Sequence, residues 1–214
     1  MKKFSNYDKV EVNEFKQTEK LNVGGHYCKI LDVNIEKLNN GSEQLSFKID
    51  IDSPDEQAGF YSRKFKEDAD KDPMTAKWKG YYKMFLPNDD GSENDEKTKS
   101  NFKGVITSIE KSNPGYDWEK ADWDEKTLIG KRFVGVFGAE EFELPTTGDL
   151  IYFVRCRFVR STEEELDKIP IPKTKLKDKS YMDYEEWLEN WDARKSGFTV
   201  NTNVNTTSDD DLPF

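Results

Sequence analysis

Basic and aromatic residues alternate along several short segments of this sequence. From Lys77 to Phe85, every second residue is a lysine, a tyrosine or a phenylalanine. A similar combination recurs in the segments 61–65 and 151–157. In a β-strand, residues with this spacing share one face. Cations on such a face can neutralise phosphates while the rings stack on bases, so the pattern indicates a groove for single-stranded nucleic acid.

Twelve side chains make up the DNA-binding set that this pattern predicts. Ten come from the three alternating segments, and the other two are bases elsewhere in the chain. The set is Lys48, Arg63, Phe65, Lys77, Lys79, Tyr81, Lys83, Phe85, Arg132, Phe153, Arg155 and Arg157. In any one segment, the rings could instead belong to the core and the bases to a solvated face. Three segments with the same alternation favour the groove.

The last six residues form the most specific motif. They are Asp209, Asp210, Asp211, Leu212, Pro213 and Phe214. A terminal ring can enter an apolar pocket while its α-carboxylate and the aspartates meet basic side chains, and a proline limits the conformations lost on docking. The motif resembles the Asp-Asp-Asp-Ile-Pro-Phe ending of bacterial single-stranded DNA-binding proteins. The resemblance implies that these residues recruit replication and recombination proteins.

Motifs for catalysis and for cofactors are missing from the sequence. It has no P-loop, no nucleophile elbow and no HExxH pair, so we expect neither an enzyme nor a bound cofactor. The single histidine, His26, is expected to be structural, and no zinc-ligand spacing exists. Asp32, Asp50 and Asp52 lie in predicted strands, where edge or solvent-facing positions explain them. Composition alone does not exclude a two-metal nuclease.

The net charge of −10 at first opposes nucleic-acid binding. However, residues 161–214 hold 13 of the 43 acidic and only 7 of the 33 basic residues, which is −6 of that total. The remaining acids cluster in predicted loops. Trp118 and Trp123 lie in one such acidic loop, and we expect them to pack it onto the body, because its charges would repel phosphates.

Composition and cysteine content also indicate the cellular compartment of the protein. Only 34% of the 214 residues are hydrophobic and 36% are charged, which fits a small core with polar extensions. Cys28 and Cys156 lie far apart in apolar runs and are expected to be buried, reduced thiols, as in a reducing compartment. No apolar stretch approaches the roughly 20 residues of a membrane span, and no signal peptide is evident. We expect a cytoplasmic protein with no membrane partner.

Hydrophobic periodicity predicts a mainly β fold. The expected strands are 27–35, 45–51, 78–86, 131–139 and 151–160, with a further short strand at 61–65. A turn at Asn39-Asn40-Gly41 joins the first two. One helix is expected around 102–109, capped by Ser100 and stopped by Asn113-Pro114-Gly115. This order predicts an OB-fold, a five-stranded Greek-key barrel with a helix between strands 3 and 4.

The chain divides by composition into four parts. Residues 1–22 are an N-terminal arm, and 23–162 are the OB-fold domain for single-stranded DNA. Residues 163–195 are a linker with a possible helix, in which Tyr184, Trp187, Leu188 and Trp191 share a face. Residues 196–214 are a disordered tether that carries the acidic tail.

A family resemblance extends beyond the tail. The stretches Ile109–Tyr116 and Leu128–Phe133 resemble single-stranded DNA-binding proteins encoded by phages of Gram-positive bacteria, and the likeness covers roughly residues 20–172. It implies an OB-fold, sequence-tolerant binding of single strands, and a role in phage DNA replication or recombination in the host cytoplasm. A homo-oligomer is possible, but the long domain and the added helix do not imply a tetramer. The alternatives are a protein-interaction adaptor and a recombination or annealing factor with incidental DNA binding.

Overall fold

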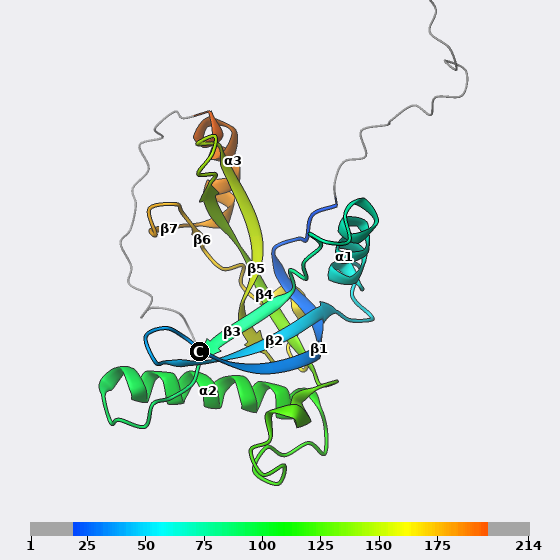
Figure 1. Cartoon of the computed structure of the whole chain (residues 1–214), viewed down its shortest axis with the longest axis vertical. Coiled ribbons are helices and arrows are strands. Elements are labelled where there is room, and N and C mark those ends of the chain that lie inside the picture. Colours follow the sequence, from blue (N-terminus) through cyan, green and yellow to red (C-terminus); the bar gives the residue numbers. More distant parts are fainter. Residues whose placement is uncertain (1–18, 197–214) are drawn as a thin grey trace, which may run out of the picture.

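The structure is a computed structural model that describes residues 19–196. In this range the chain is a mixed α/β fold with a seven-stranded sheet and three helices (Figure 1). The strands are β1 (Gly24–Lys37), β2 (Glu43–Ile51), β3 (Tyr81–Phe85), β4 (Arg132–Glu143), β5 (Leu150–Arg160), β6 (Thr174–Lys175) and β7 (Tyr181–Met182). The helices are α1 (Phe60–Lys71), α2 (Glu93–Ser112) and α3 (Tyr184–Lys195). Most of the expected arm, the tether and the tail at 209–214 lie outside the described residues.

The first five strands follow the expected sequence order, with α2 between β3 and β4. In the sheet, β1 lies between β2 and β4, while β3 pairs with β2 and β5 pairs with β4, all antiparallel. No ladder joins β3 to β5 within residues 19–196, so the sheet is not closed into a barrel. The prediction of a mainly β fold is only partly right, because the fold is mixed α/β and contains the unexpected helix α1. The strands β6 and β7 were not expected either, and the sheet has seven strands rather than the five of the predicted barrel.

A β-bulge explains the broken alternation in the first strand. Ile30 pairs with Ile49 and Asp32 pairs with Lys48, so Leu31 is an extra residue on β1. Ile30 is therefore buried on the core side, Leu31 is exposed, and burial resumes at Val33 with the opposite parity. The turn that leads into β2 is as predicted, with Gly41 at a φ of 88°.

The segment 61–65 is part of helix α1, so the prediction of a strand there was wrong. The N-cap residue Gly59 has no side chain to satisfy the first N–H groups of the helix. The carboxylate of Asp50 on β2 accepts them instead, from Tyr61 at 2.8 Å and Ser62 at 3.2 Å. Asp50 is buried and was wrongly assigned to a solvent-facing position. This cap depends on a residue 11 and 12 positions upstream of the two N–H groups, which local sequence patterns do not reveal.

Helix α2 begins earlier than predicted. Ser92, rather than Ser100, is the N-cap, and its side chain accepts the N–H of Asp95. The first two turns are polar and lack apolar periodicity, so the sequence pattern missed them. The expected buried face is confirmed at Val105, Ile106 and Ile109. None of the helices formed by residues 19–196 is both long and apolar enough to cross a membrane.

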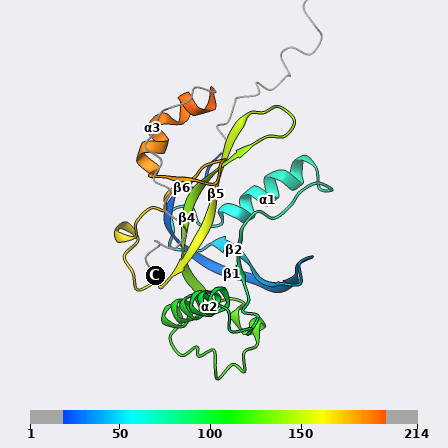
Figure 2. The ribbon, with the colours of Figure 1, turned by 90° about the vertical axis from the view of Figure 1, so that its left-hand side faces the viewer.

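The segment expected to be a linker adds two strands to the sheet. β6 pairs in parallel with β4, and β7 pairs with β6. Helix α3 follows and lies beside the β4–β5 hairpin (Figure 2). Its Trp187 is fully buried beside Ala139 of β4 and Met182 of β7. Leu188, which was expected to share a face with Trp187, is 51% exposed.

A buried carboxylate fixes α3 to the sheet. Glu141 on β4 accepts hydrogen bonds from Arg194 Nε at 2.6 Å and Nη2 at 2.9 Å, and from Trp187 Nε1 at 2.9 Å. The N–H of Lys177 donates a further bond at 3.1 Å. Desolvation by burial raises the pKa of Glu141, but these bonds outweigh it and hold the pKa below its ordinary value of 4.5. Glu141 is therefore ionised and fully partnered.

We predict that Glu141→Gln lowers the free energy of unfolding by about 3 kcal/mol, because it leaves the guanidinium of Arg194 without its carboxylate. Denaturant titration followed by tryptophan fluorescence measures the change. Since the folded pKa is depressed, the stabilisation by Glu141 is present above pH 4.5 and is lost as pH falls through the folded pKa. The difference in the free energy of unfolding between the unchanged protein and Glu141→Gln should therefore become smaller as the pH falls.

The matched control is Glu143→Gln, two residues along the same strand. Glu143 pairs with Lys177 at 2.7 Å, but both side chains are about half exposed. Its loss should cost less than about 1 kcal/mol. Equal effects of the two substitutions would contradict the assigned role of Glu141.

Candidate nucleic-acid interface

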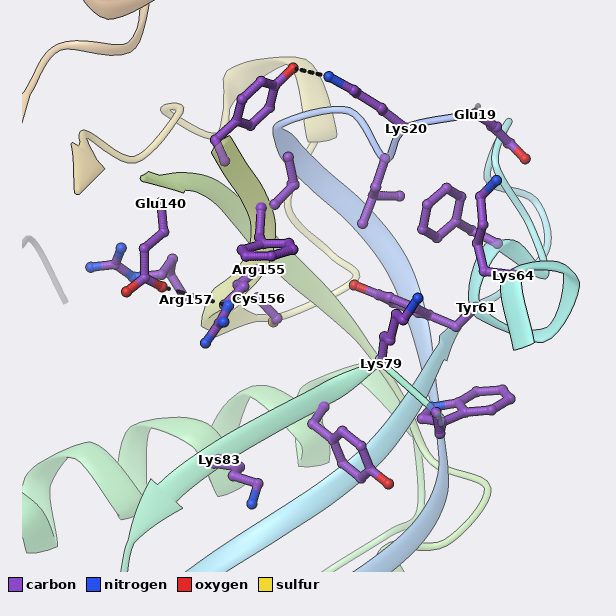
Figure 3. A pocket seen from close by; sticks show the side chains of 17 residues that line it. Glu19, Lys20, Tyr61, Lys64, Lys79, Lys83, Glu140, Arg155, Cys156 and Arg157 are labelled. Carbon is purple, nitrogen blue, oxygen red and sulfur yellow. Dashed lines mark hydrogen bonds and ion pairs between the residues drawn. The ribbon is translucent and has the colours of Figure 1, made fainter. Parts of the chain in front are cut away.

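A groove of about 770 Å³ lies between α1, β3 and β5, where the sheet is open. Figure 3 shows Arg155 and Arg157 on β5 on one side of it, and Lys83 on β3 and Lys64 on α1 elsewhere around it. The short segment that precedes β1 closes one end. There, Lys20 Nζ donates to the Tyr152 hydroxyl at 3.1 Å.

The lining combines positive charge with aromatic rings. Six of its residues are basic, six are aromatic, and only Glu19 and Glu140 are acidic. The basic residues are Lys20, Lys64, Lys79, Lys83, Arg155 and Arg157, and the aromatic ones are Phe60, Tyr61, Trp78, Tyr81, Tyr152 and Phe153. A concentration of cations in a chain with a net charge of −10 makes the groove a local anion-attracting site.

Half of the predicted DNA-binding set lines this groove. These six residues come from the 77–85 and 151–157 segments, which the fold brings to opposite sides. They are Lys79, Tyr81, Lys83, Phe153, Arg155 and Arg157. The alternation of basic and aromatic residues therefore identified two sides of one groove, although nothing in the sequence placed them face to face.

Two predicted residues support the lining without joining it. Lys48 Nζ lies 4.5 Å from the ring centroid of Trp78. The centroid of the Phe65 ring lies 5.8 Å from that of the Trp78 ring. Trp78 itself donates its indole N–H to the carbonyl of Gly80 at 2.9 Å. These contacts hold the indole in the wall of the groove.

The other four predicted residues lie outside the groove. Arg63 binds Glu19 at 2.8 Å, and Arg132 binds Asp52 at 2.7 Å. Lys77 is exposed ahead of β3, and Phe85 is exposed at the far end of that strand.

Helix α1 contributes residues that the sequence pattern missed. Read as a strand, 61–65 groups Tyr61, Arg63 and Phe65. In the helix, Phe60, Tyr61 and Lys64 share a face instead, and all three line the groove. The spacing of Phe60 and Lys64 at i and i+4 was the sequence signal that could have indicated a shared helix face. Lys20 and Tyr152 gave no comparable signal, because the tertiary structure alone brings them together.

Four groove cations are held by carboxylates. Lys64 binds Glu67 at 3.0 Å. Lys79 binds Asp68 at 2.6 Å, and this hydrogen bond lowers the pKa of Asp68. Lys83 binds Glu36 at 2.9 Å. Arg155 lies 3.7 Å from Glu140, which has a closer partner in Lys175 at 3.0 Å. The pairs fix the cations in place and leave Arg155 the least tightly held.

A second bulge directs Arg157 toward the groove. Val136 pairs with Phe158 while Phe137 pairs with Cys156, so Arg157 is the extra residue on β5. Its guanidinium lies 5.6 Å from the Tyr181 ring centroid, and Nη2 donates to the Tyr181 hydroxyl at 3.3 Å. Nη1 is buried and has no hydrogen-bond partner in the described structure. Such an unsatisfied donor is able to donate a hydrogen bond to an anionic ligand after a small rearrangement.

The two thiols lie deep beside the groove and are free, as expected. Burial raises the pKa of both Cys28 and Cys156, so they are neutral and poor nucleophiles. Cys28 is buried and Cys156 is half-buried in the lining. They act as packing residues, and both sulfurs lie close to Gly135.

Residues 19–196 contain no group of three or more His, Cys, Asp or Glu side chains placed to hold a metal ion. No model of a known protein family matches the sequence, and no curated protein matches it. The function of the groove must therefore be inferred from its own shape and charge.

Gly80 allows its backbone to lie close to the Ile49 carbonyl oxygen and the Tyr61 ring. A Cβ at this position would lie 2.4 Å from the Ile49 carbonyl oxygen and 2.5 Å from the Tyr61 ring. Gly80→Ala should therefore lower the free energy of unfolding by about 2–3 kcal/mol through overpacking. Thermal and urea unfolding measure this loss.

Gly104→Ala is the control, because nothing lies within 4 Å of its Cβ position in α2. It should stabilise the protein by about 0.5–1 kcal/mol, since alanine restricts the unfolded chain and favours the helix. Effects of the same sign at both glycines would contradict the described contact between Gly80 and Tyr61.

Proposed function

We propose that this protein binds single-stranded DNA in the groove between α1, β3 and β5, without sequence preference and without catalysis. The observation that carries the proposal is the lining: six basic and six aromatic side chains against two acids. Grooves that combine cations with stacking platforms are the usual way to hold single strands. Every base offers a ring face, so stacking tolerates any sequence.

Two of the ring positions suit stacking. Tyr81 is 41% exposed and Phe153 is 43% exposed, on opposite strands. The ring of Tyr152 is already occupied, because Lys20 Nζ lies 4.3 Å from its centroid and Trp187 and Trp191 pack against it. Each stacked base contributes about 1–3 kcal/mol, and phosphate contacts add a salt-dependent part. A duplex buries its base faces, so it cannot use these rings. Preference for single strands follows from that difference.

We further propose that β1 to β5 represent an OB-fold opened between β3 and β5. The strand order β3-β2-β1-β4-β5 and the position of α2 between β3 and β4 support this. OB-folds are partly open Greek-key barrels whose faces bind oligonucleotides. Together with the family resemblance, this favours a phage protein that protects and presents single strands during replication or recombination in the host cytoplasm.

The test is titration of labelled dT oligomers and of a matched duplex at two salt concentrations. We expect tighter binding to the single strand, with affinity that falls as salt rises. Arg155→Gln should weaken binding and reduce the slope of log K against log salt by about 0.7, the contribution of one phosphate contact. Tighter binding to duplex would overturn the proposal.

Arg132→Gln is the matched control for Arg155→Gln. The two side chains are equally exposed, at 58% and 59%, but Arg132 does not line the groove. Both substitutions remove one positive charge. If they reduce affinity and slope equally, DNA responds to overall charge and the groove is not its site.

Residues 209–214 are proposed to recruit partner proteins. Deletion of these six residues should abolish capture of a replication or recombination protein that binds such tails, while the groove still binds dT oligomers. A Phe214→Ala variant should do the same with the aspartates intact, because the terminal ring is the apolar anchor. Pull-down with a purified tail-binding protein tests this, and undiminished capture by both variants would exclude the role.

A further inference from the structure

Trp123 is an exposed aromatic residue on a surface that the groove does not use. It is 62% exposed, whereas Trp118 in the same loop is 5% exposed and belongs to the core. Both rings pack against the body, as expected, but only Trp118 is buried there; Trp123 packs on Phe102 and on the edge of Trp118 and stays largely exposed. One face of Trp123 stacks on Phe102 of α2, with ring centroids 6.2 Å apart and an interplanar angle of 4°. This contact leaves much of the indole open to solvent.

The backbone holds Trp123 in this position at a cost. Asp122 and Trp123 have φ values of 55° and 59°, in the left-handed region that residues with a Cβ rarely adopt. Two consecutive such residues, neither of them glycine, mark a strained turn. Strain that persists in a folded loop is a reason to look for a function there. In this loop, the strained turn carries the exposed indole.

The surroundings of Trp123 are strongly acidic. Residues 117–125 contain five carboxylates and a single lysine. That lysine, Lys120, binds Asp117 at 2.6 Å. The next basic residue, Lys126, donates its ammonium to the carbonyl of Val33 and so points away from the loop. The loop that carries the ring therefore has a net negative charge.

This surface is separate from the DNA groove. None of the residues from 93 to 131 lines the groove. Figures 1 and 2 show the segment between α2 and β4 at the end of the molecule opposite α3. Its charge would repel a phosphate backbone, so nucleic acid is excluded as its ligand.

We propose that the Trp123 surface binds an arginine-bearing basic segment of a partner protein. A guanidinium can stack on the open indole face and at the same time donate to neighbouring carboxylates, which an ammonium does less well. Both features are present here, an exposed ring and a carboxylate border. The site is independent of the groove, so the protein could hold DNA and this partner together.

The test uses the full chain and a labelled nine-residue peptide of alternating arginine and glycine, followed by fluorescence anisotropy. We expect binding that Trp123→Ala weakens about tenfold, the effect of one desolvated cation–π contact. Trp123→Phe should retain most of the affinity, because it keeps a ring. The lysine version of the peptide should bind more weakly than the arginine version.

Two controls separate the site from bulk attraction to an acidic protein. Leu188→Ala removes another exposed apolar side chain, on α3, and should leave binding unchanged. Asp122→Asn removes one charge at a position where asparagine tolerates the left-handed backbone, and it should weaken binding. Melting curves check that each variant is folded.

Three outcomes would overturn the proposal. Equal affinity of Trp123→Ala and the unchanged protein would mean that net charge alone attracts the peptide. Equal affinity for the arginine and lysine peptides would remove the stacking role. If sedimentation shows that the unchanged protein is a dimer and that Trp123→Ala is a monomer, a second copy of the chain covers this surface instead.

Discussion

The offset between β4 and its neighbour β1 is the constraint on which the rest of the molecule depends. Only residues 132–137 of β4 pair with β1, while β5 pairs with residues 134–143 of β4. The hairpin therefore extends past the end of β1, and its free length needs a cover. β6 and α3 supply it, with Glu141 as the polar anchor. The same geometry leaves the outer edge of β5 unpaired beside β3, and the groove lies there.

The electrostatics of the groove follow from this arrangement. Its cations come from four separate parts of the chain, and several are held by carboxylates that lie at its border or beyond it. Bulk acidity and a local basic site therefore coexist, because the lining holds six basic residues and only two acids, while the partner carboxylates Asp68 and Glu36 lie outside the lining. A strand of DNA would meet cations that are already positioned, which reduces the side-chain entropy lost on binding.

Two β-bulges change the directions of side chains on β1 and β5. One places Leu31 outside the core of β1, and the other directs Arg157 to the groove and to Tyr181 of β7. Arg157 therefore touches both the proposed DNA site and the unit that carries α3. The acidic loop around Trp123 lies on the other side of the core, so the two candidate binding surfaces do not compete for space.

The sequence by itself determined the strands that bury one face, the turn at Gly41, the apolar face of α2, and the basic and aromatic alternation of β3 and β5. These features depend on local periodicity, which sequence records directly. Only the tertiary structure decided that α1 is a helix, because its cap comes from Asp50 on another strand. It also decided which half of the predicted DNA-binding residues share a groove, and that Glu141 is buried rather than solvated. Such outcomes depend on long-range packing, in which residues far apart in the chain supply each other's partners.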